Sequence, residues 1–242
     1  MFLGIDLGTS EVKAVLVDEA GAVVARAGAP LEISRPQPRW SEQDPEAWWG
    51  ATLVAIEQLR QEQASALAAV RGIGLSGQMH GATLLDAADR PLRPAILWND
   101  VRADRECAEL LARAPATTEI TGNRAMPGFT APKLLWVARH EPEIFARLRT
   151  VLLPKDFVRL KLSGEKISDL SDASGTLWLE VGRRDWSDAM LAACHLSRAN
   201  VPRIVEGSAP GGRLRPALGA RFGMKQPVIV AGGAGDNAAS AV

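Results

Sequence analysis

The segment "GIDLGTSEVKAVLVD", residues 4–18, contains two strand-like runs on either side of a Gly-Thr-Ser turn. The first run is 2–8 and the second is 12–19, and a third, 23–30, follows a Glu-Ala-Gly turn. β-Branched and apolar residues favour extended backbone, whereas glycine and small polar residues favour tight turns. The start of the chain therefore predicts an antiparallel meander of three strands.

A helix is predicted directly after the meander, over 46–61. Asp44 can cap its first turn, Pro45 has the backbone angle that this turn needs, and Glu46 suits the positive end of the helix dipole. This helix is followed by alternating strands and helices, which indicates an α/β fold with a mixed sheet. The further regular segments are two strands and one helix, at 70–77, 94–100 and 102–114.

The segment 120–220 has a less regular pattern than the rest of the chain. Residues 127–148 predict a loop and two helices, and residues 162–180 predict loops and short strands. We expect this segment to form an insertion or a lid on the α/β domain.

Composition excludes several classes of protein. Lys+Arg and Asp+Glu are equal at 28 each, so no excess of charge suggests a nucleic acid or a membrane as partner. The start "MFLGIDLGTS" lacks the pattern of a signal peptide, and no run is apolar for long enough to span a bilayer. Cys107 and Cys194 are far apart and have no metal-like spacing, which is typical of reduced thiols. We expect a cytoplasmic protein.

Asp6 ends the first apolar run, just before the turn of Gly8, Thr9 and Ser10. The backbone N–H groups and hydroxyls of such a turn can hold phosphate oxygens. A carboxylate beside phosphates suits hydrated magnesium, which needs only one or two protein carboxylates. The alternative is a simple hairpin turn with a solvated aspartate.

Asp236 has the same context, in "VIVAGGAGDNAAS" at 228–240. The glycines before it let the backbone approach a ligand closely. An aspartate at this position can also serve only as a helix cap. Because Asp6 and Asp236 each end an apolar strand beside a glycine-containing turn, the pair favours a site built from two halves with phosphates between them.

With these motifs the sequence resembles the FGGY carbohydrate kinases, which belong to the actin/Hsp70/hexokinase-like superfamily. Residues 4–18 are similar to the first phosphate-binding segment of that family, and "GGAGDNAASA" is similar to the segment with its catalytic aspartate. The resemblance implies a ribonuclease H-like α/β domain with a mixed five-stranded sheet flanked by helices. Five further segments resemble the branch that phosphorylates D-xylulose: 76–81, 97–103, 127–143, 152–165 and 168–181.

FGGY kinases have two domains with the active site between them. The resemblance implies that residues 1–242 are the N-terminal, sugar-binding domain and that the C-terminal, nucleotide-binding domain is absent. The chain stops two turns into the helix after Asp236, without a helix-ending signal, which favours the same interpretation. The implied partners are D-xylulose, ATP and that missing domain, and a homodimer stays open. We expect this chain alone to lack kinase activity.

The resemblance also assigns roles on the phosphate side. Asp236 is implied as the general base that takes the proton of the attacking sugar hydroxyl. Asp6 is implied as the Mg²⁺ ligand, with ATP phosphates near Gly8, Thr9 and Ser10. Lys13 is a candidate to neutralise phosphate charge, and a solvated strand lysine is an equal alternative.

Sugar recognition is implied for the loop "GQMHGA" and its neighbours. His80 would contact a hydroxyl, Met79 would offer an apolar edge to the carbon face of the sugar, and Gln78 would orient the loop. Asp100 and Arg102 serve either the site or an internal salt bridge. The substrate-binding candidates are Met79, His80, Gly81, Trp98, Asn99, Asp236 and Asn237.

Other functions remain as alternatives at this point. Hsp70-like ATPases and actin share the fold, but "SGQMHG" and "LWNDVR" have no place in either. A non-catalytic sugar-binding protein would not need Asp236 as a base. Within the family, the ribulose, gluconate, fuculose and glycerol kinases are the other candidates, although "QMHG" stands where glycerol kinases have an Arg-Glu pair.

Overall fold

Three strands at the start of the chain form the meander that the sequence predicts. The computed structural model describes residues 1–241. Strands β1 (Phe2–Leu7), β2 (Glu11–Val17) and β3 (Val23–Pro30) pair antiparallel in this order. On its other side β1 pairs in parallel with β5 (Gly72–Gly77), so the sheet is mixed as predicted.

The end of the chain completes the same sheet. Strands β14 (Ile229–Ala231) and β15 (Ala234–Gly235) both pair in parallel with β5, and β13 (Pro210–Arg213) pairs antiparallel with β14. Within residues 1–241 the sheet thus has seven strands, where five were predicted. The number differs because Gly233, at φ +78°, divides one predicted strand in two, and because β13 comes from the segment whose pattern was irregular.

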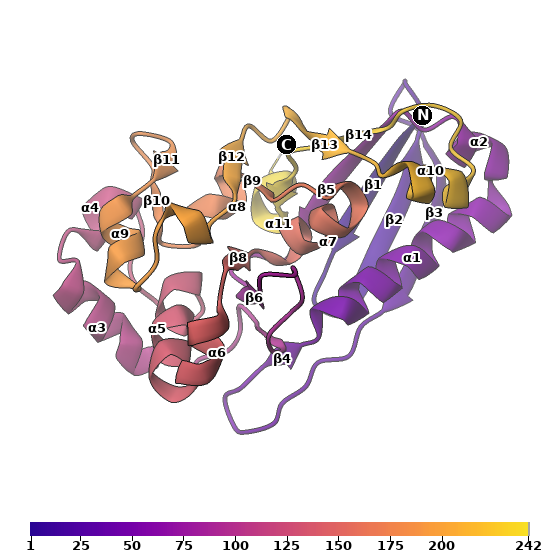
Figure 1. Ribbon diagram of the computed structural model, residues 1–242. Helices are drawn as coiled ribbons and strands as arrows, with labels where there is room; N and C mark the ends of the chain where they lie inside the picture. The colour runs from indigo at the N-terminus through magenta and orange to yellow at the C-terminus, as the bar shows by residue number, and fades with distance from the viewer. Residues whose placement is uncertain (242) are drawn as a thin grey trace.

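One face of the sheet is covered by helices (Figure 1). Helix α1 (Pro45–Glu62) packs on β2 and β3, and its start is as predicted, because the Asp44 side chain accepts a hydrogen bond from the backbone N–H of Glu46. Trp48 of α1 is completely buried in the hydrophobic core between this helix and the sheet, and we call this part of the molecule the sheet lobe. The other helices of the lobe are α2 (Ala64–Ala68), α7 (Pro154–Ser163) and α10 (Pro216–Phe222).

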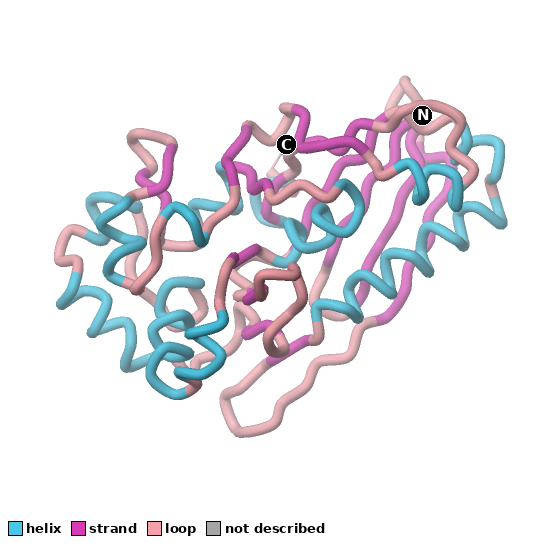
Figure 2. Tube along the Cα trace, viewed as in Figure 1, coloured by secondary structure: helices cyan, strands magenta, loops and turns pink. Residues whose placement is uncertain are grey.

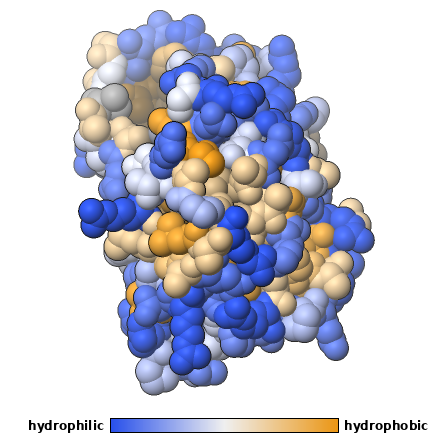
Figure 3. Space-filling view, turned by 90° about the vertical axis from the view of Figure 1, so that its left-hand side faces the viewer, coloured by the Kyte–Doolittle hydropathy of each residue, from blue (hydrophilic) through white to orange (hydrophobic). Residues whose placement is uncertain are grey.

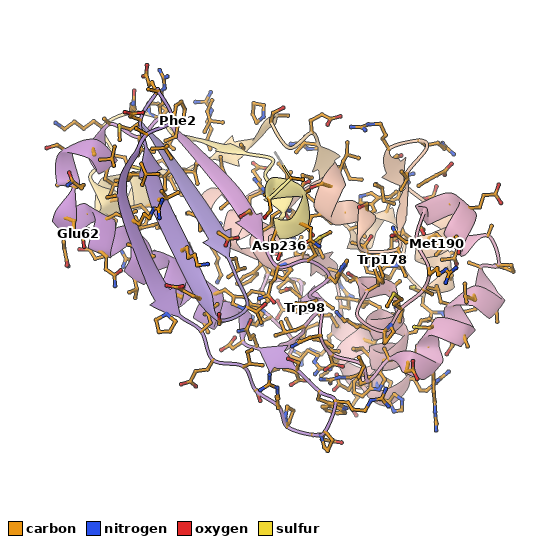
Figure 4. All side chains as sticks on the ribbon, turned by 180° about the vertical axis from the view of Figure 1, so that it is seen from behind. Phe2, Glu62, Trp98, Trp178, Met190 and Asp236 are labelled. Carbon is orange, nitrogen blue, oxygen red and sulfur yellow. The ribbon has the colours of Figure 1, made fainter. Side chains whose placement is uncertain are left out.

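The opposite face of the sheet is open in the view from behind (Figure 4). Alternate residues of β1, Gly4 and Asp6 among them, point to this face and are only partly buried. The short helix α11 (Asp236–Ala239) stands beside this face and begins with Asp236. The predicted site residues of β1 and α11 therefore share one side of the sheet.

A second lobe, mostly helical, has its own hydrophobic core (Figure 2). Four pairs of short strands, each outside the main sheet, connect its parts. The helices are α3 (Asp104–Arg113), α4 (Thr117–Thr121), α5 (Thr130–His140), α6 (Pro142–Arg147), α8 (Leu170–Ser174), α9 (Asp188–Ala193) and the 3₁₀ helix η1 (Arg198–Asn200). The strand pairs are β4 (Glu42–Gln43) with β7 (Ala95–Ile96), β6 (Thr83–Leu85) with β8 (Thr150–Leu152), β9 (Ile167–Asp169) with β12 (Arg203–Val205), and β10 (Leu179–Glu180) with β11 (Asp185–Trp186).

The predicted strand 94–100 is wrong in length and place. Its strand part is β7 alone, which pairs with β4 and not with the main sheet. The chain turns away after β7 because the buried Asp100 carboxylate accepts hydrogen bonds from the backbone N–H of Ser41 and from Arg102. A buried carboxylate must be paired in this way, and this requirement outweighs the apolar pattern before it.

The segment 120–220 is shared between the two cores. Helix α7 lies within it, yet Phe157 and Val158 pack in the core of the sheet lobe. Conversely, the second core begins with Ala82 and includes Leu110, well before residue 120. The two predicted helices of 127–148 are present as α5 and α6, whereas 162–180 contains the helix α8 in addition to strands.

The surface of the second lobe mixes apolar and charged side chains (Figure 3). Apolar side chains gather in the middle of this face, with hydrophilic ones around them. Exposed large hydrophobic side chains of this lobe include Leu111, Met126 and Val181. Of the helices within residues 1–241, none combines the length and the apolar composition that a bilayer span requires.

The cap of α1 can be tested by Asp44→Ala. Loss of a side-chain N-cap costs about 1 kcal/mol, because a backbone N–H of the first turn is left without a partner. We expect the free energy of unfolding, measured by urea titration, to fall by about this amount. Asp44→Ser, which keeps an oxygen that can accept the same bond, should stay close to wild type. Equal losses in both variants would contradict the cap.

Candidate active site

Three loops meet at one edge of the sheet because their strands run in parallel. Leu7 of β1 and Gly235 of β15 are both register partners of Gly77 in β5. The carboxyl ends of these strands thus lie side by side, which is where open α/β sheets bind ligands. The turn that starts at Gly8, the Gln78–Gly81 loop and Asp236 leave the sheet from this edge.

The negative charge of Asp6 influences Asp236 across this edge. Asp6 accepts a hydrogen bond of 2.7 Å from the Ser76 hydroxyl of the neighbouring strand. Asp236 is partly buried, and its carboxylate accepts the backbone N–H of Asn237 at 2.8 Å. Burial raises the pKa of Asp236, the Asn237 bond opposes this, and the negative charge of Asp6 raises it further. The charge of Asp6 is thus felt at Asp236, and the assignment of the two aspartates to one site stays a prediction.

Thr9 is held by a chain of hydrogen bonds. Its hydroxyl donates to Gln78 Oε1 at 3.2 Å and accepts from the indole N–H of Trp98 at 3.0 Å. Gln78 is buried and donates to Gln43 Oε1 at 2.9 Å. Gln43 in turn donates to the Thr9 carbonyl and accepts from the indole of Trp48. The Gly8–Ser10 turn, the Gln78–Gly81 loop and the hydrophobic core under α1 are therefore connected by hydrogen bonds.

The backbone of His80 is fixed from the second lobe. His80 has φ +67°, and its carbonyl accepts hydrogen bonds from Lys133 Nζ at 2.9 Å and from the Thr130 hydroxyl at 3.2 Å. Lys133 is completely buried. Burial lowers the pKa of Lys133 to about 7, against the attraction of the Asp100 charge. Helix α5 thus keeps the loop in a left-handed conformation that histidine seldom adopts.

The ring of His80 is neutral and has a defined tautomer. Nδ1 lies 2.8 Å from the Gly175 carbonyl, and because a carbonyl can only accept, Nδ1 carries the proton. Burial lowers the pKa of His80 to about 4, the Gly175 bond opposes this, and the Lys133 charge adds to the lowering. Phe129 packs against the ring at 4.5 Å between centroids. Nε2 is left as a hydrogen-bond acceptor.

Two glycines face the loop at distances that exclude side chains. A Cβ atom at Gly175 would lie 2.5 Å from His80 Cε1, and one at Gly235 would lie 2.8 Å from Met79 Cγ. One at Gly81 would lie 2.5 Å from Pro154 Cγ. Met79 and His80 therefore pack directly against backbone from two other segments.

A hollow of about 1390 Å³ opens beside this edge, between the sheet and the second lobe. Lys13 lines this hollow. It is the register partner of Asp6 on β2, and its side chain is exposed. Ala238 and Ala239 of α11 also border the hollow. The polar residues that line it include Asp6, Lys13, Ser76, Ser171, Arg184 and Glu206.

The other candidates lie around the edge in different surroundings. Asp236 and Trp98 both lie between the sheet and the helical lobe (Figure 4). Trp98 is 49% exposed, which excludes a core role. Asn99, Asn237 and Ser10 are exposed, and Asn99 has no hydrogen bond within the described residues. The backbone N–H of Gly8 donates to the Glu11 carbonyl, which closes the turn.

Asp100 and Arg102 form the internal salt bridge that was one of the two interpretations. The side chains of both are about 1% exposed, and Arg102 Nη2 lies 2.6 Å from Asp100 Oδ2. Arg102 also pairs with Glu42 and stacks over Trp40 at 3.7 Å. Asp100 and Arg102 hold the segment after β7 against Ser41 and Glu42, and neither residue lines the hollow.

Three residues that the sequence analysis did not single out shape this site: Ser76, Lys133 and Gly175. Lys133 had a usable signal, since it is a cation directly before the apolar run Leu134–Val137 of α5, and such a residue must find a partner when buried. Ser76 and Gly175 had no such signal, because their partners are 70 and 95 residues away in sequence. Within residues 1–241, no group of three or more His, Cys, Asp or Glu side chains could hold a metal ion.

Comparison with known proteins shows the family of the chain. The profile of the FGGY family of carbohydrate kinases, N-terminal domain, matches residues 1–242. The chain belongs to this family, and the predicted ribonuclease H-like fold is confirmed. Hsp70-like ATPases and actin are thereby excluded.

The curated relatives that match the whole chain are named xylulose kinase, and the similar solved structures include xylulose kinases beside a gluconate kinase and a glycerol kinase. Xylulose kinase of Escherichia coli (strain K12) is 58% identical over 242 residues, which are 100% of this chain and 49% of that protein. A "xyloylose kinase" from Brucella ovis has a TM-score of 0.96 at 59% identity, over 98% of this chain and 49% of that chain. Xylulose kinase from Rhodospirillum rubrum has a TM-score of 0.93 at 31% identity, over 99% and 49%. The chain spans about half the length of these relatives.

The neutral state of His80 predicts a dependence of stability on pH. Its pKa of about 4 lies below the ordinary value of 6.5, so the unfolded chain binds more protons than the folded chain between these values. The free energy of unfolding should therefore fall as the pH falls from 6.5 to 4. In His80→Asn this part of the fall should be missing when urea titrations are compared across the window. His140→Asn, at an exposed histidine, is the control, and equal slopes for His80→Asn and wild type would contradict the prediction.

Proposed function

We propose that this chain is the sugar-binding half of a longer kinase, which transfers the γ-phosphoryl group of ATP to D-xylulose and forms D-xylulose 5-phosphate. The observation that carries the proposal is the meeting of Asp236, His80 and the Gly8–Ser10 turn at the carboxyl edge of three parallel strands. The relatives at 58% and 59% identity are xylulose kinases by name, which supports D-xylulose as the substrate.

In this proposal Asp236 is the general base. Its carboxylate takes the proton of the 5-hydroxyl while the hydroxyl oxygen forms a bond to the γ-phosphorus and the bond to the ADP oxygen breaks. The raised pKa of Asp236 supports this role, because a carboxylate that is partly buried beside another negative charge accepts a proton more readily. The glycines before it leave space for sugar and phosphate together.

The sugar lies against the Met79–His80 loop in this proposal. Nε2 of the neutral His80 accepts a hydrogen bond from a sugar hydroxyl, since Nδ1 is already committed to Gly175. Met79 covers the carbon face of the sugar, and the Gly81 backbone completes the loop. The exposed side chains of Trp98, Asn99 and Asn237 supply contacts on the solvent side of the sugar.

The phosphates of ATP lie at the first turn in this proposal. The turn of Gly8, Thr9 and Ser10 lies beside them and offers the backbone N–H groups of Thr9 and Ser10 and the Ser10 hydroxyl, because the Gly8 N–H and the Thr9 hydroxyl already donate to Glu11 and Gln78. The Lys13 ammonium balances the phosphate charge from the neighbouring strand. Asp6 fits a hydrated Mg²⁺, which requires only one or two carboxylates and would offset the repulsion between Asp6 and Asp236. The bound ion supplies charge neutralisation on the phosphates.

The remaining part of the active site belongs to a partner domain. Because the chain spans about half the length of its relatives, we assign the adenosine site to a C-terminal domain of the same polypeptide. That domain would face the hollow beside the sheet and enclose the phosphates. A kinase for another sugar or polyol, or a sugar-binding protein without activity, would be distinguished by assaying ADP release from the full-length protein with a panel of ketoses and polyols.

The role of Asp236 is tested by Asp236→Asn in the full-length protein. Asparagine keeps the shape of the side chain but cannot take the proton, so kcat with D-xylulose should fall by on the order of 10²-fold or more. The affinity for D-xylulose should change much less. Asp104→Asn, at an exposed aspartate of α3, should retain wild-type turnover. A kcat within a few-fold of wild type for Asp236→Asn would exclude the proposed base.

The role of His80 is tested by His80→Ala in the same protein. Loss of a buried acceptor costs roughly 1–3 kcal/mol, which corresponds to a rise in KM for D-xylulose of about 5- to 150-fold. The KM for ATP should change by less than about threefold on the same argument, because ATP does not contact this ring. His195→Ala, at an exposed histidine of the second lobe, is the control. Equal changes for both substrates, with a lower melting temperature, would identify His80 as structural only.

A further inference from the structure

A cluster of charged side chains is buried between the two lobes, and the proposed function assigns it no role. Lys155 of α7 lies at its centre, with Nζ at 2.8 Å from Asp156, 2.8 Å from Asp169 and 3.0 Å from Asp172. Each of these side chains is at most 1% exposed. Arg159, one turn later on α7, is equally buried and lies 3.8 Å from Asp156. We call these five residues the buried charge cluster.

One arm of the buried charge cluster reaches the segment that presents Asp236. The guanidinium of Arg159 donates through its two terminal nitrogens to the carbonyls of Ala231 and Gly232. Ala231 ends β14 and Gly232 follows it, four residues before Asp236. A Cβ at Gly211 would lie 2.5 Å from Arg159 Nη1, so the guanidinium is enclosed by backbone. Two donors in one rigid plane thus fix two successive peptide groups.

The other arm of the buried charge cluster reaches the Gln78–Gly81 loop through helix α8. Asp169 caps α8, since its carboxylate accepts from the backbone N–H groups of Ser171 and Asp172 and from the Ser171 hydroxyl. The Ser171 hydroxyl also accepts the backbone N–H of Gly235, the residue before Asp236, at 3.3 Å. At its other end, α8 leads into Gly175, whose carbonyl holds the Nδ1 proton of His80.

Stability alone gives a weak reason for such a cluster. Burying charges costs free energy, and well-packed apolar residues in their place are often as stable or more stable. Burial raises the pKa of Asp172, and the charge of Lys155 opposes this. The remaining advantage of the cluster is that its hydrogen bonds are directional. Arg159 and Asp169 each fix the positions of particular backbone groups.

We propose that the buried charge cluster positions the base and the sugar ligand relative to each other, with Arg159 and Ser171 as the positioning residues for Asp236. Arg159 fixes the peptide groups before the Gly-Gly turn, and Ser171 fixes the peptide group next to Asp236. Through Asp169 and α8 the same cluster sets the place of Gly175 and thus of His80. This inference rests on the proposed function for its kinetic consequence, but its structural part does not.

The decisive variant is Arg159→Lys in the full-length protein. Lysine keeps the positive charge beside Asp156 but has a single ammonium, which cannot bond both carbonyls in a fixed plane. A displacement of about 1 Å at a reacting group can cost on the order of 10²-fold in rate. We expect kcat with D-xylulose to fall by about 10- to 100-fold, with the KM values for D-xylulose and ATP within about threefold of wild type. The control is Arg149→Lys, whose guanidinium also donates to a backbone carbonyl but lies between α6 and β8.

A milder pair of variants covers the case in which Arg159→Lys does not fold. Ser171→Ala removes the acceptor for the Gly235 N–H and leaves the backbone part of the α8 cap intact. It should lower kcat with little change in KM or in melting temperature, and Ser171→Thr, which keeps the hydroxyl, should restore kcat. A kcat within about twofold of wild type for Ser171→Ala, or a loss that threonine does not restore, would overturn the proposal.

Hydrogen exchange separates this inference from the proposed function. In Arg159→Lys, peptides that cover 231–237 should exchange faster than in wild type, whereas peptides of α1 should not change. This holds whether or not the full-length protein phosphorylates D-xylulose, so an inactive wild type would refute the proposed function and leave this test standing. Unchanged exchange at 231–237 in both Arg159→Lys and Ser171→Ala would refute the positioning role.

Discussion

The parallel register between β1, β5 and β15 is the constraint on which the site depends. Gly77 lies between Leu7 and Gly235, so the residues that follow these three leave the sheet together. A shift of one residue in either pairing would turn every side chain of that strand to the other face. Asp6 would then point into the core below the sheet, where a carboxylate without a partner cannot remain charged. The position of the chemistry is thus decided by backbone hydrogen bonds between strands far apart in sequence.

Polar contacts at this edge join the two hydrophobic cores. A line of hydrogen bonds runs from Trp48 through Gln43 and Gln78 to Thr9. On the other side, Lys133 and Gly175 of the second lobe hold the backbone and the ring of His80. Buried polar groups that are satisfied only in one arrangement specify that arrangement more strictly than apolar packing does. The loop between the cores is therefore well defined even though it lies near the surface.

The sequence predicted well those features whose signals are local. The meander needs only the alternation in 2–30, and the start of α1 needs only Asp44, Pro45 and Glu46. The motif around Asp236 was found because its glycines stand next to it. Features set by distant partners were missed: β13 depends on pairing with β14, the run 94–100 is bent by the pairing of Asp100 with Ser41 and Arg102, and Gly175 matters only through His80. No local pattern contains such pairings, since they arise only when the chain is folded.

The two glycines that face the Met79–His80 loop also affect how this site can change during evolution. On that side the wall consists of backbone, and any side chain at Gly175 or Gly235 would overlap with the loop. A point mutation there cannot adjust the shape of the site by a small step. Trp98, in contrast, is half exposed and is attached through one side-chain hydrogen bond to Thr9. Substitutions on the solvent side of the site, such as at Trp98, can thus change ligand preference gradually. Substitutions at the two glycines cannot.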